Sequence, residues 1–182
     1  MHAGPEMEPA DLRRSARDEQ VCWILETLTA RDQTLAVAES LTGGSLAARF
    51  VEVPGASSAF RGAVVAYAAD LKTTLLGVSA DLLATNGPVD PRVVAAMAEG
   101  VAVRLSATFG VATTGVAGPS PHGGIAPGTA YVAVARRGDT RVSSLQLSGD
   151  RASVREQAAD EALALLVQVL REAGADDGEH GV

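Results

Sequence analysis

Aromatic side chains are scarce in this sequence, which has one Trp, two Tyr and three Phe among 182 residues. Hydrophobic residues nevertheless make up 47% of the chain, so the protein is predicted to be globular rather than disordered. Alanine, valine and leucine must therefore fill the core, and such small side chains let helices approach a sheet closely. The length suits one domain and is sufficient to bury a core.

Cysteine and positive charge are also in short supply. The single cysteine, Cys22, excludes an internal disulfide, fits a reducing compartment and is expected to pack on a helix beside Trp23. The formal net charge of -7 argues against a nucleic-acid partner, because a nucleic-acid-binding protein presents a basic face. The histidines, His2, His122 and His180, form no ligand cluster, so neither a metal site nor a cofactor is expected.

Long apolar runs are missing. No run approaches the ~20 residues that a membrane-spanning helix needs, so no membrane partner is expected. Residues 1–10 carry two acidic residues and no apolar segment, which does not fit a secretory signal. We therefore expect a cytoplasmic protein.

Segments with helical and strand patterns alternate along the chain. Helices are expected at about residues 11–30, 45–53, 70–76, 80–85, 91–105 and 152–173. Strands are expected at about residues 34–38, 60–67, 108–113, 128–135 and 141–147, the last two joined as a hairpin. This order predicts a three-layer α/β/α fold with a mixed, mostly parallel sheet. We expect a single domain over residues 11–173, between flexible tails at residues 1–10 and 174–182.

Two glycine-rich turns, residues 39–44 and 114–124, follow predicted strands. Because ligands bind beyond the carboxyl ends of strands in open α/β sheets, the two turns can form one crevice. The first turn offers the hydroxyl groups of Ser40 and Thr42 at the start of a helix. Ser40 is a candidate nucleophile there, beside free N–H groups that can hold an anion or an oxyanion. On spacing alone, helix capping is the more common role for these hydroxyls.

Lys72 is the only lysine among the 15 basic residues, and it lies five positions after Tyr67. A lysine near a serine can act as its base when burial lowers the pKa of the amine, and a tyrosine can relay a proton. The alternative is a half-buried tyrosine beside a solvated surface lysine. Arg151, at the start of the last predicted helix, belongs either to an ordinary first turn or to a site that binds phosphate or carboxylate.

Six segments, in order, resemble motifs of the CinA C-terminal domain family. Residues 38–44 (AESLTGG) resemble AES-C-TGG, and residues 60–78 resemble the block F-x-G-x-V-x-Y…K…LGV. The other four are residues 86–90, similar to HGAVS, residues 114–119, similar to SGIAGP, residues 128–129, similar to part of VGTV, and residues 148–151, identical to SGDR. The resemblance covers about residues 19–170, and six ordered motifs are far more specific than any single one.

This resemblance implies nicotinamide-nucleotide amidohydrolase activity, in which nicotinamide mononucleotide (NMN) and water give nicotinate mononucleotide and ammonia. It implies Ser40 as the nucleophile, with Tyr67 and Lys72 as its activating partners. It also implies a substrate site that contains Glu39, Thr42, Gly43, Gly44, Gly115, Ala117, Gly118 and Arg151. The molybdopterin-binding-like domain of longer members does not precede these motifs here, so the stand-alone type is expected. Small α/β domains rich in alanine and valine often pair, so we also expect a homo-oligomer.

Some positions depart from the family pattern. Leu41 stands where the family usually has cysteine, Ala69 replaces a frequent asparagine, and Pro88 replaces an alanine. The loop at residues 120–127 lacks the common Glu-Lys-Pro piece and carries His122. The serine, tyrosine and lysine all remain, so the catalytic apparatus is expected to be intact, with an altered rim that can change the substrate. The alternatives are a silent nucleotide-binding or structural paralogue and an amidohydrolase of another small amide.

Overall fold

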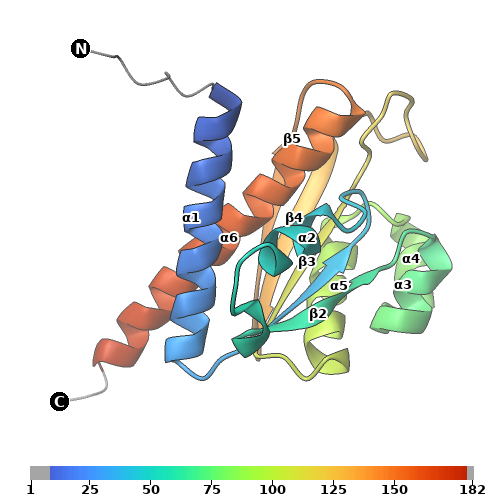
Figure 1. The fold of residues 1–182 in the computed structure, drawn as a ribbon. Coiled ribbons are helices and arrows are strands. Elements are labelled where there is room, and N and C mark those ends of the chain that lie inside the picture. The colour runs from blue at the N-terminus through green and yellow to red at the C-terminus, as the bar shows by residue number, and fades with distance from the viewer. Residues whose placement is uncertain (1–8, 180–182) are drawn as a thin grey trace, which may run out of the picture.

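A five-stranded sheet lies between two layers of helices in the computed structural model, which describes residues 9–179 (Figure 1). The strands are β1 (Leu35–Glu39), β2 (Phe60–Val65), β3 (Phe109–Gly115), β4 (Thr129–Arg136) and β5 (Asp139–Gln146), in the order β2-β1-β3-β4-β5. β1 pairs in parallel with β2 and β3, whereas β4 is antiparallel to both β3 and β5. Only β4 therefore runs against the other strands, and the sheet is mixed, as predicted.

The helices divide between the two faces of this sheet. One face is covered by α1 (Pro9–Ala30), α2 (Ser45–Val51) and α6 (Arg151–Glu179), and the other by α3 (Ala69–Leu76), α4 (Ala80–Asn86) and α5 (Pro91–Arg104). A short 3-10 helix, η1 (Ala56–Ser58), leads into β2. The predicted three-layer α/β/α fold is confirmed. Within residues 9–179, no helix is both long and apolar enough to cross a bilayer.

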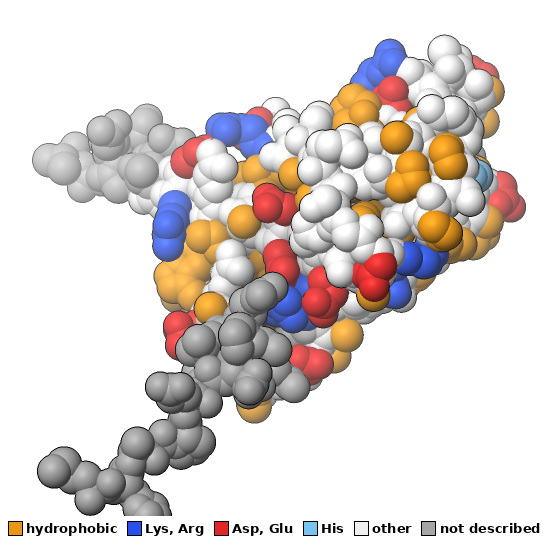
Figure 2. Space-filling view, turned by 90° about the horizontal axis from the view of Figure 1, so that it is seen from above, with side chains coloured by type: hydrophobic (Ala, Val, Ile, Leu, Met, Phe, Trp, Pro, Cys, Tyr) orange, Lys and Arg blue, Asp and Glu red, His pale blue; other side chains and the backbone are white. Residues whose placement is uncertain are grey.

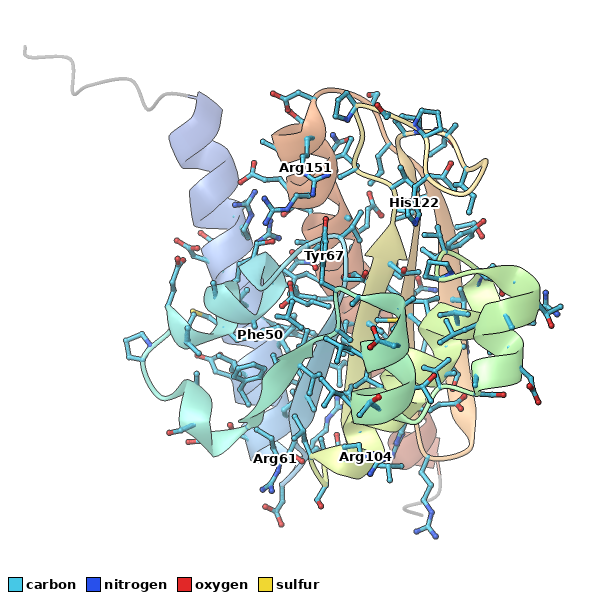
Figure 3. All side chains as sticks on the ribbon, turned by 90° about the vertical axis from the view of Figure 1, so that its right-hand side faces the viewer. Phe50, Arg61, Tyr67, Arg104, His122 and Arg151 are labelled. Carbon is cyan, nitrogen blue, oxygen red and sulfur yellow. The ribbon has the colours of Figure 1, made fainter. Side chains whose placement is uncertain are left out.

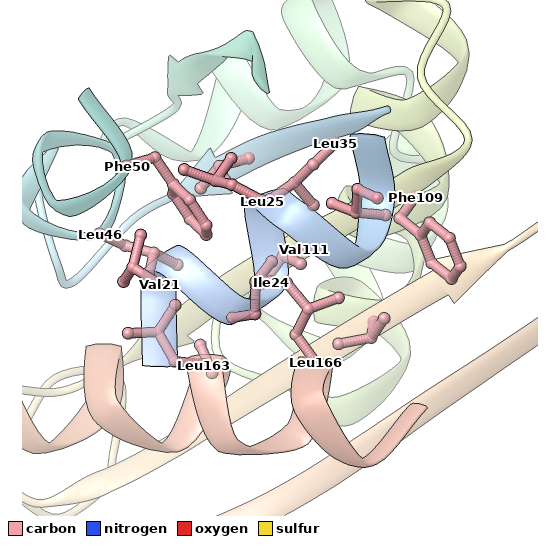
Figure 4. Packing of buried hydrophobic residues seen from close by; sticks show 14 of the residues in the cluster. Val21, Ile24, Leu25, Leu35, Leu46, Phe50, Phe109, Val111, Leu163 and Leu166 are labelled. Atoms are coloured by element: carbon pink, nitrogen blue, oxygen red, sulfur yellow. The ribbon is translucent and has the colours of Figure 1, made fainter. Parts of the chain in front are cut away.

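The two cores differ in the size of their side chains, because successive residues of a strand point to opposite faces. Leu35 and Val37 of β1 point toward α1 and α6, where they join a cluster that includes Phe50 and Leu163 (Figure 4). Ala36, next to them in β1, points toward α5. The α5 face is thus lined by small strand residues, which lets this helix lie close to the sheet.

Both ends of the described chain are more helical than expected. α1 begins at Pro9 rather than near residue 11, and α6 continues to Glu179 instead of ending at Ala173. The sequence after Ala173 contains no proline, and a glycine inside a helix costs only about 1 kcal/mol relative to alanine, so α6 has no strong stop signal there. The rest of the two expected tails, residues 1–8 and 180–182, lies outside the described residues.

A glycine brings α3, the helix that carries Lys72, into direct contact with α5. Gly100 lies within α5, and a Cβ atom at this position would overlap the backbone carbonyl of Leu76, the last residue of α3. The two helices therefore touch backbone to backbone, which only glycine permits. The position of α3 over the sheet depends on this contact.

We expect Gly100→Ala to lower the free energy of unfolding by about 1–3 kcal/mol, the usual cost of overpacking a close contact. The sign is informative, because alanine at an exposed helix position would instead stabilise the protein by about 1 kcal/mol. Urea denaturation followed by circular dichroism measures the change. Gly174→Ala in α6 is the matched control, since its added Cβ meets only the movable end of the Arg31 side chain. A Gly100→Ala protein as stable as the wild type would contradict the contact.

Candidate functional site

Ser40 lies at the carboxyl end of β1, in the turn that leads into α2. Its backbone N–H donates a hydrogen bond to the carbonyl oxygen of Thr113 in β3 over 3.0 Å. On the other side, the N–H of Ala66 donates to the carbonyl oxygen of Glu39 over 2.9 Å. The candidate nucleophile is therefore held between both neighbouring strands, at the sheet edge where α/β proteins bind ligands.

The side chain of Glu39 holds the start of α2. It is fully buried, and its carboxylate accepts hydrogen bonds from the backbone N–H groups of Gly44 (2.8 Å), Leu46 (3.2 Å) and Ala47 (2.8 Å). A helix start otherwise leaves such N–H groups without partners. Glu39 and Gly44, both expected to bind substrate, therefore bond to each other, because a buried carboxylate needs donors and these are adjacent. Neither residue lines the cleft described below.

Thr42 and Gly43, expected to contact substrate as well, belong to the same turn as Ser40. Thr42 is fully buried, and its hydroxyl oxygen is 2.7 Å from that of Thr113. Gly43 has a φ of +63°, in the left-handed region that glycine adopts without strain. Neither residue lines the cleft, since Thr42 is buried and Gly43 is exposed outside it. The capping role considered for Ser40 and Thr42 is filled by Glu39 instead.

Lys72 reaches the turn from α3, on the other side of the sheet. Its side chain is 1% exposed, and its Nζ lies 3.1 Å from Ser40 Oγ and 2.7 Å from the carbonyl oxygen of Ala66. Burial lowers the pKa of the Lys72 amine from 10.5 to about 8, because an ammonium ion is poorly solvated there. A solvated surface lysine is thus excluded, and a fraction of Lys72 is a free amine near neutral pH that can accept the Ser40 proton.

Ser40 and Lys72 open into a cleft of about 560 Å³. Seen from above, acidic and basic side chains are scattered over this end of the molecule without one large patch of either sign (Figure 2). The cleft itself is lined by three basic side chains, those of Lys72, Arg151 and His122, and by no carboxylate from the described part of the chain. Because the whole chain has a net charge of -7, this local excess of basic groups suits a ligand with negative charge.

Arg151, Tyr67 and Gly118 meet at the cleft, with Tyr67 and Arg151 on the same side of the site (Figure 3). Arg151 Nη2 donates to the Tyr67 hydroxyl oxygen, and Nη1 donates to the carbonyl oxygen of Gly118, both over 3.0 Å. Tyr67 is 61% exposed, and its recorded hydrogen bond joins it to Arg151 rather than to Ser40. Tyr67 therefore shares the cleft with the serine and the lysine, and its part in activating Ser40 stays a prediction.

The opposite wall of the cleft comes from the second glycine-rich turn. Gly115, Ala117 and Gly118 all line it, as does Arg151, so four of the eight residues expected to bind substrate lie at the cleft. Gly115 has no room for a side chain, because a Cβ there would crowd the backbone of β4. Contact of these residues with a substrate stays a prediction.

The positions that depart from the family pattern also gather at this cleft. Leu41, Ala69 and Pro88 line it, together with His122 from the loop. His122 is placed by a tight hairpin, in which the backbone groups of His122 and Ile125 exchange two hydrogen bonds of 3.1 and 2.9 Å. The departures are therefore concentrated on the surface that a ligand would touch.

Arg155 is a residue that the sequence analysis missed. Its Nε donates to the carbonyl oxygen of Leu41 over 3.1 Å, and its Nη2 donates to that of Thr42 over 2.6 Å. A signal existed, since Arg155 follows Arg151 by four positions and thus shares a helix face with it.

No metal centre is formed by the described residues. The described side chains include no group of three or more histidine, cysteine, aspartate or glutamate residues that could hold an ion.

Comparisons with known proteins agree over most of the chain. The model of the family described as CinA C-terminal domain matches residues 19–170. A CinA-like protein of Frankia casuarinae is 50% identical over 147 residues, which are 81% of this chain and 34% of that protein. A putative competence-damage inducible protein of Moorella thermoacetica is 41% identical over 145 residues, 79% of this chain and 35% of that protein. The chain thus spans about a third of the length of these curated relatives.

Solved structures show the same fold. A CinA superfamily protein from Klebsiella pneumoniae superposes with a TM-score of 0.82 at 30% identity, covering 86% of this chain and 98% of that one. The competence/damage inducible protein CihA from Agrobacterium tumefaciens gives a TM-score of 0.81 at 29% identity, covering 94% and 99%. Sequence motifs, family match and fold agree, and the chain belongs to the CinA C-terminal domain family.

Proposed function

We propose that this chain is an amidohydrolase that deamidates NMN, with Ser40 as the nucleophile and Lys72 as its base. The observation that carries the proposal is the distance of 3.1 Å between Lys72 Nζ and Ser40 Oγ at the cleft. The family resemblance supports the choice of substrate, because the motifs that imply it occur in order along the chain. We infer that the reaction serves pyridine-nucleotide salvage, and that the protein acts in the cytoplasm, where the lone cysteine would stay reduced. We also infer that it works there as a homo-oligomer.

The reaction begins when Ser40 Oγ attacks the carboxamide carbon of the nicotinamide group. The free amine of Lys72 takes the Ser40 proton as the new C–O bond forms and the carbonyl oxygen becomes an oxyanion. The C–N bond then breaks, and Lys72 returns the proton to the nitrogen, which leaves as ammonia. The rest of the substrate remains bound to Ser40 as an ester of its pyridine carboxyl group. Lys72 takes a proton from a water molecule as the water attacks this ester, and returns the proton to Ser40 Oγ as the ester C–O bond breaks and nicotinate mononucleotide is released.

The carbonyl oxygen of Ala66 supports this role of Lys72. It accepts a hydrogen bond from the lysine over 2.7 Å, and both the ammonium ion and the free amine have an N–H to donate. In the free amine, the lone pair can then point toward the Ser40 hydroxyl. The amine is thereby oriented without an ion pair, which would hold it in the charged form.

The negative charge of NMN suits the basic side chains of the cleft. Arg151 donates one hydrogen bond from each of its two terminal nitrogens, and a guanidinium group has five N–H donors in all. The remaining donors can bind phosphate oxygens, for which arginine has the right planar geometry. His122 lines the same cleft, and its imidazole N–H can donate a second hydrogen bond to the phosphate.

We expect Ser40→Ala and Lys72→Met each to lower kcat for ammonia release from NMN by at least about 10³-fold, because the nucleophile or its base is lost. Lys72→Arg should be equally inactive, since a guanidinium group keeps its proton. A coupled ammonia assay on the purified proteins measures this, with circular dichroism as a check of folding. Ser45→Ala, at the start of α2 and away from the cleft, is the matched control and should keep wild-type activity.

Three results would each redirect this proposal. Ser40→Ala that releases ammonia as fast as the wild type would remove Ser40 from the mechanism. A wild-type protein that binds NMN tightly in calorimetry without turnover would favour the silent nucleotide-binding paralogue. Turnover of other small amides but not of NMN would favour an amidohydrolase with a different substrate.

The pH dependence should report the Lys72 amine. Because only the unprotonated amine can take the Ser40 proton, we expect kcat/KM for NMN to rise with pH and to level off above about 8, the pKa of Lys72. The range from pH 7 to 9.5 is suitable, since a phosphate monoester titrates near 6 and is already fully charged there. A profile that is flat or that falls across this range would contradict the role of Lys72 as the base.

A further inference from the structure

The first two turns of α6 present two arginines to the site. Arg151 and Arg155 lie four positions apart and therefore on one face of the helix. Arg151 bonds to Tyr67 and to the carbonyl of Gly118, which belong to two walls of the cleft. Arg155 bonds instead to the carbonyl oxygens of Leu41 and Thr42, in the turn that follows Ser40. Only the first of these two arginines lines the cleft, so the second must act on the site through the backbone.

Arg155 holds the peptide group between Leu41 and Thr42 and the one between Thr42 and Gly43. Its Nε and Nη2 donate to the carbonyl oxygens of Leu41 and Thr42 over 3.1 and 2.6 Å. A guanidinium group is a rigid planar fork, so it fixes both carbonyls relative to each other. In a trans peptide the N–H points opposite to the carbonyl, and the directions of the Thr42 and Gly43 N–H groups are thereby fixed too.

The Thr42 carbonyl also accepts a hydrogen bond from the backbone N–H of Ser45 over 3.3 Å, and the other restraints on this turn lie before and after the segment that Arg155 binds. Before it, Ser40 N–H bonds to Thr113, and after it, the Glu39 carboxylate holds the N–H of Gly44. Between these points the Thr42 hydroxyl bonds to β3, and the Leu41 carbonyl accepts its hydrogen bond from Arg155. Gly43, within this stretch, has no side chain that would restrict its backbone. The bonds from Arg155 to the Leu41 and Thr42 carbonyls differ from these restraints, because they come from α6, outside the unit formed by β1, the turn and α2.

We propose that Arg155 is a positioning residue for the reaction, whose bonds to the Leu41 and Thr42 carbonyls keep Ser40 Oγ within reach of Lys72 Nζ. Its effect on turnover rests on the proposed function, whereas its effect on the geometry of the turn does not. Misplacing a reacting atom by about 1 Å can cost about 10²-fold in rate, so a tether of this kind has a measurable consequence.

The kinetic test compares Arg155→Ala, Arg155→Lys and the wild type with NMN as substrate. We expect Arg155→Ala to lower kcat about 10²-fold and to leave KM within about 3-fold, because Arg155 does not line the cleft. Arg155→Lys, which can satisfy one carbonyl at a time, should fall between the two. Guanidinium ion added at millimolar concentration should restore part of the activity of Arg155→Ala.

Arg49→Ala is the matched control for this series. Arg49 is buried, whereas Arg155 is partly buried, and Arg49 likewise joins the α2 region to α6, through Asp160 at 2.7 Å and the carbonyl of Glu156 at 3.2 Å. Its loss should lower the melting temperature without lowering kcat, and added guanidinium should not raise its activity. An Arg155→Ala protein that behaves in the same way, less stable but with wild-type kcat, would overturn the inference.

Crystal structures separate this inference from the proposed function. In Arg155→Ala we expect residues 41–43 to be displaced or disordered and the distance from Ser40 Oγ to Lys72 Nζ to exceed 3.5 Å, with Arg155→Lys as the substitute if the alanine variant does not fold. If the wild type releases no ammonia from NMN, the proposed function fails, but the displaced turn still supports the positioning role. A turn that stays in place without Arg155 overturns that role, whatever the substrate proves to be.

Discussion

A buried carboxylate fixes the turn on which the site depends. Glu39 accepts three backbone N–H groups at the start of α2, and a carboxylate removed from water would be costly to leave without such donors. Moving α2 relative to β1 would break these bonds inside the protein, where no water replaces them. Ser40, the next residue, is thus held where the strand ends and the helix begins. The distances from Ser40 to Lys72 and to the other cleft residues therefore depend on the position of this turn.

The two central side chains reach each other from opposite layers of the fold. Ser40 stands at the end of β1 before α2, whereas Lys72 comes from α3 on the other face of the sheet. They meet because α3 packs on α5 through Gly100, and because the carbonyl of Ala66 gives the buried amine a partner. The bonds from Arg155 to the turn come from α6, which covers the sheet face opposite α3. The cleft is therefore a product of all three layers rather than of one loop.

Much of this arrangement could be predicted from the sequence, and the failures have physical causes. Apolar spacing and turn residues indicated the six α-helices and five strands of the described chain but not the short helix η1, and Lys72 was notable from sequence as the only lysine. A glycine-rich turn, however, does not reveal in which direction its N–H groups point, so the sequence does not show that the Glu39 carboxylate accepts the N–H groups at the start of α2. A helix arginine such as Arg155 has the same pattern as a solvated one, and only the fold shows which carbonyls it meets.

The burial of Lys72 couples folding to proton release. Its pKa is about 8 in the folded protein and 10.5 ordinarily, so between these values the unfolded chain binds more protons than the folded one. Raising the pH through this window therefore favours folding, whereas below about 8 the folded state bears the full penalty of enclosing an ammonium ion. At neutral pH the amine that the reaction needs is thus a group that weakens the native state, and catalytic competence and thermodynamic stability act against each other at a single atom.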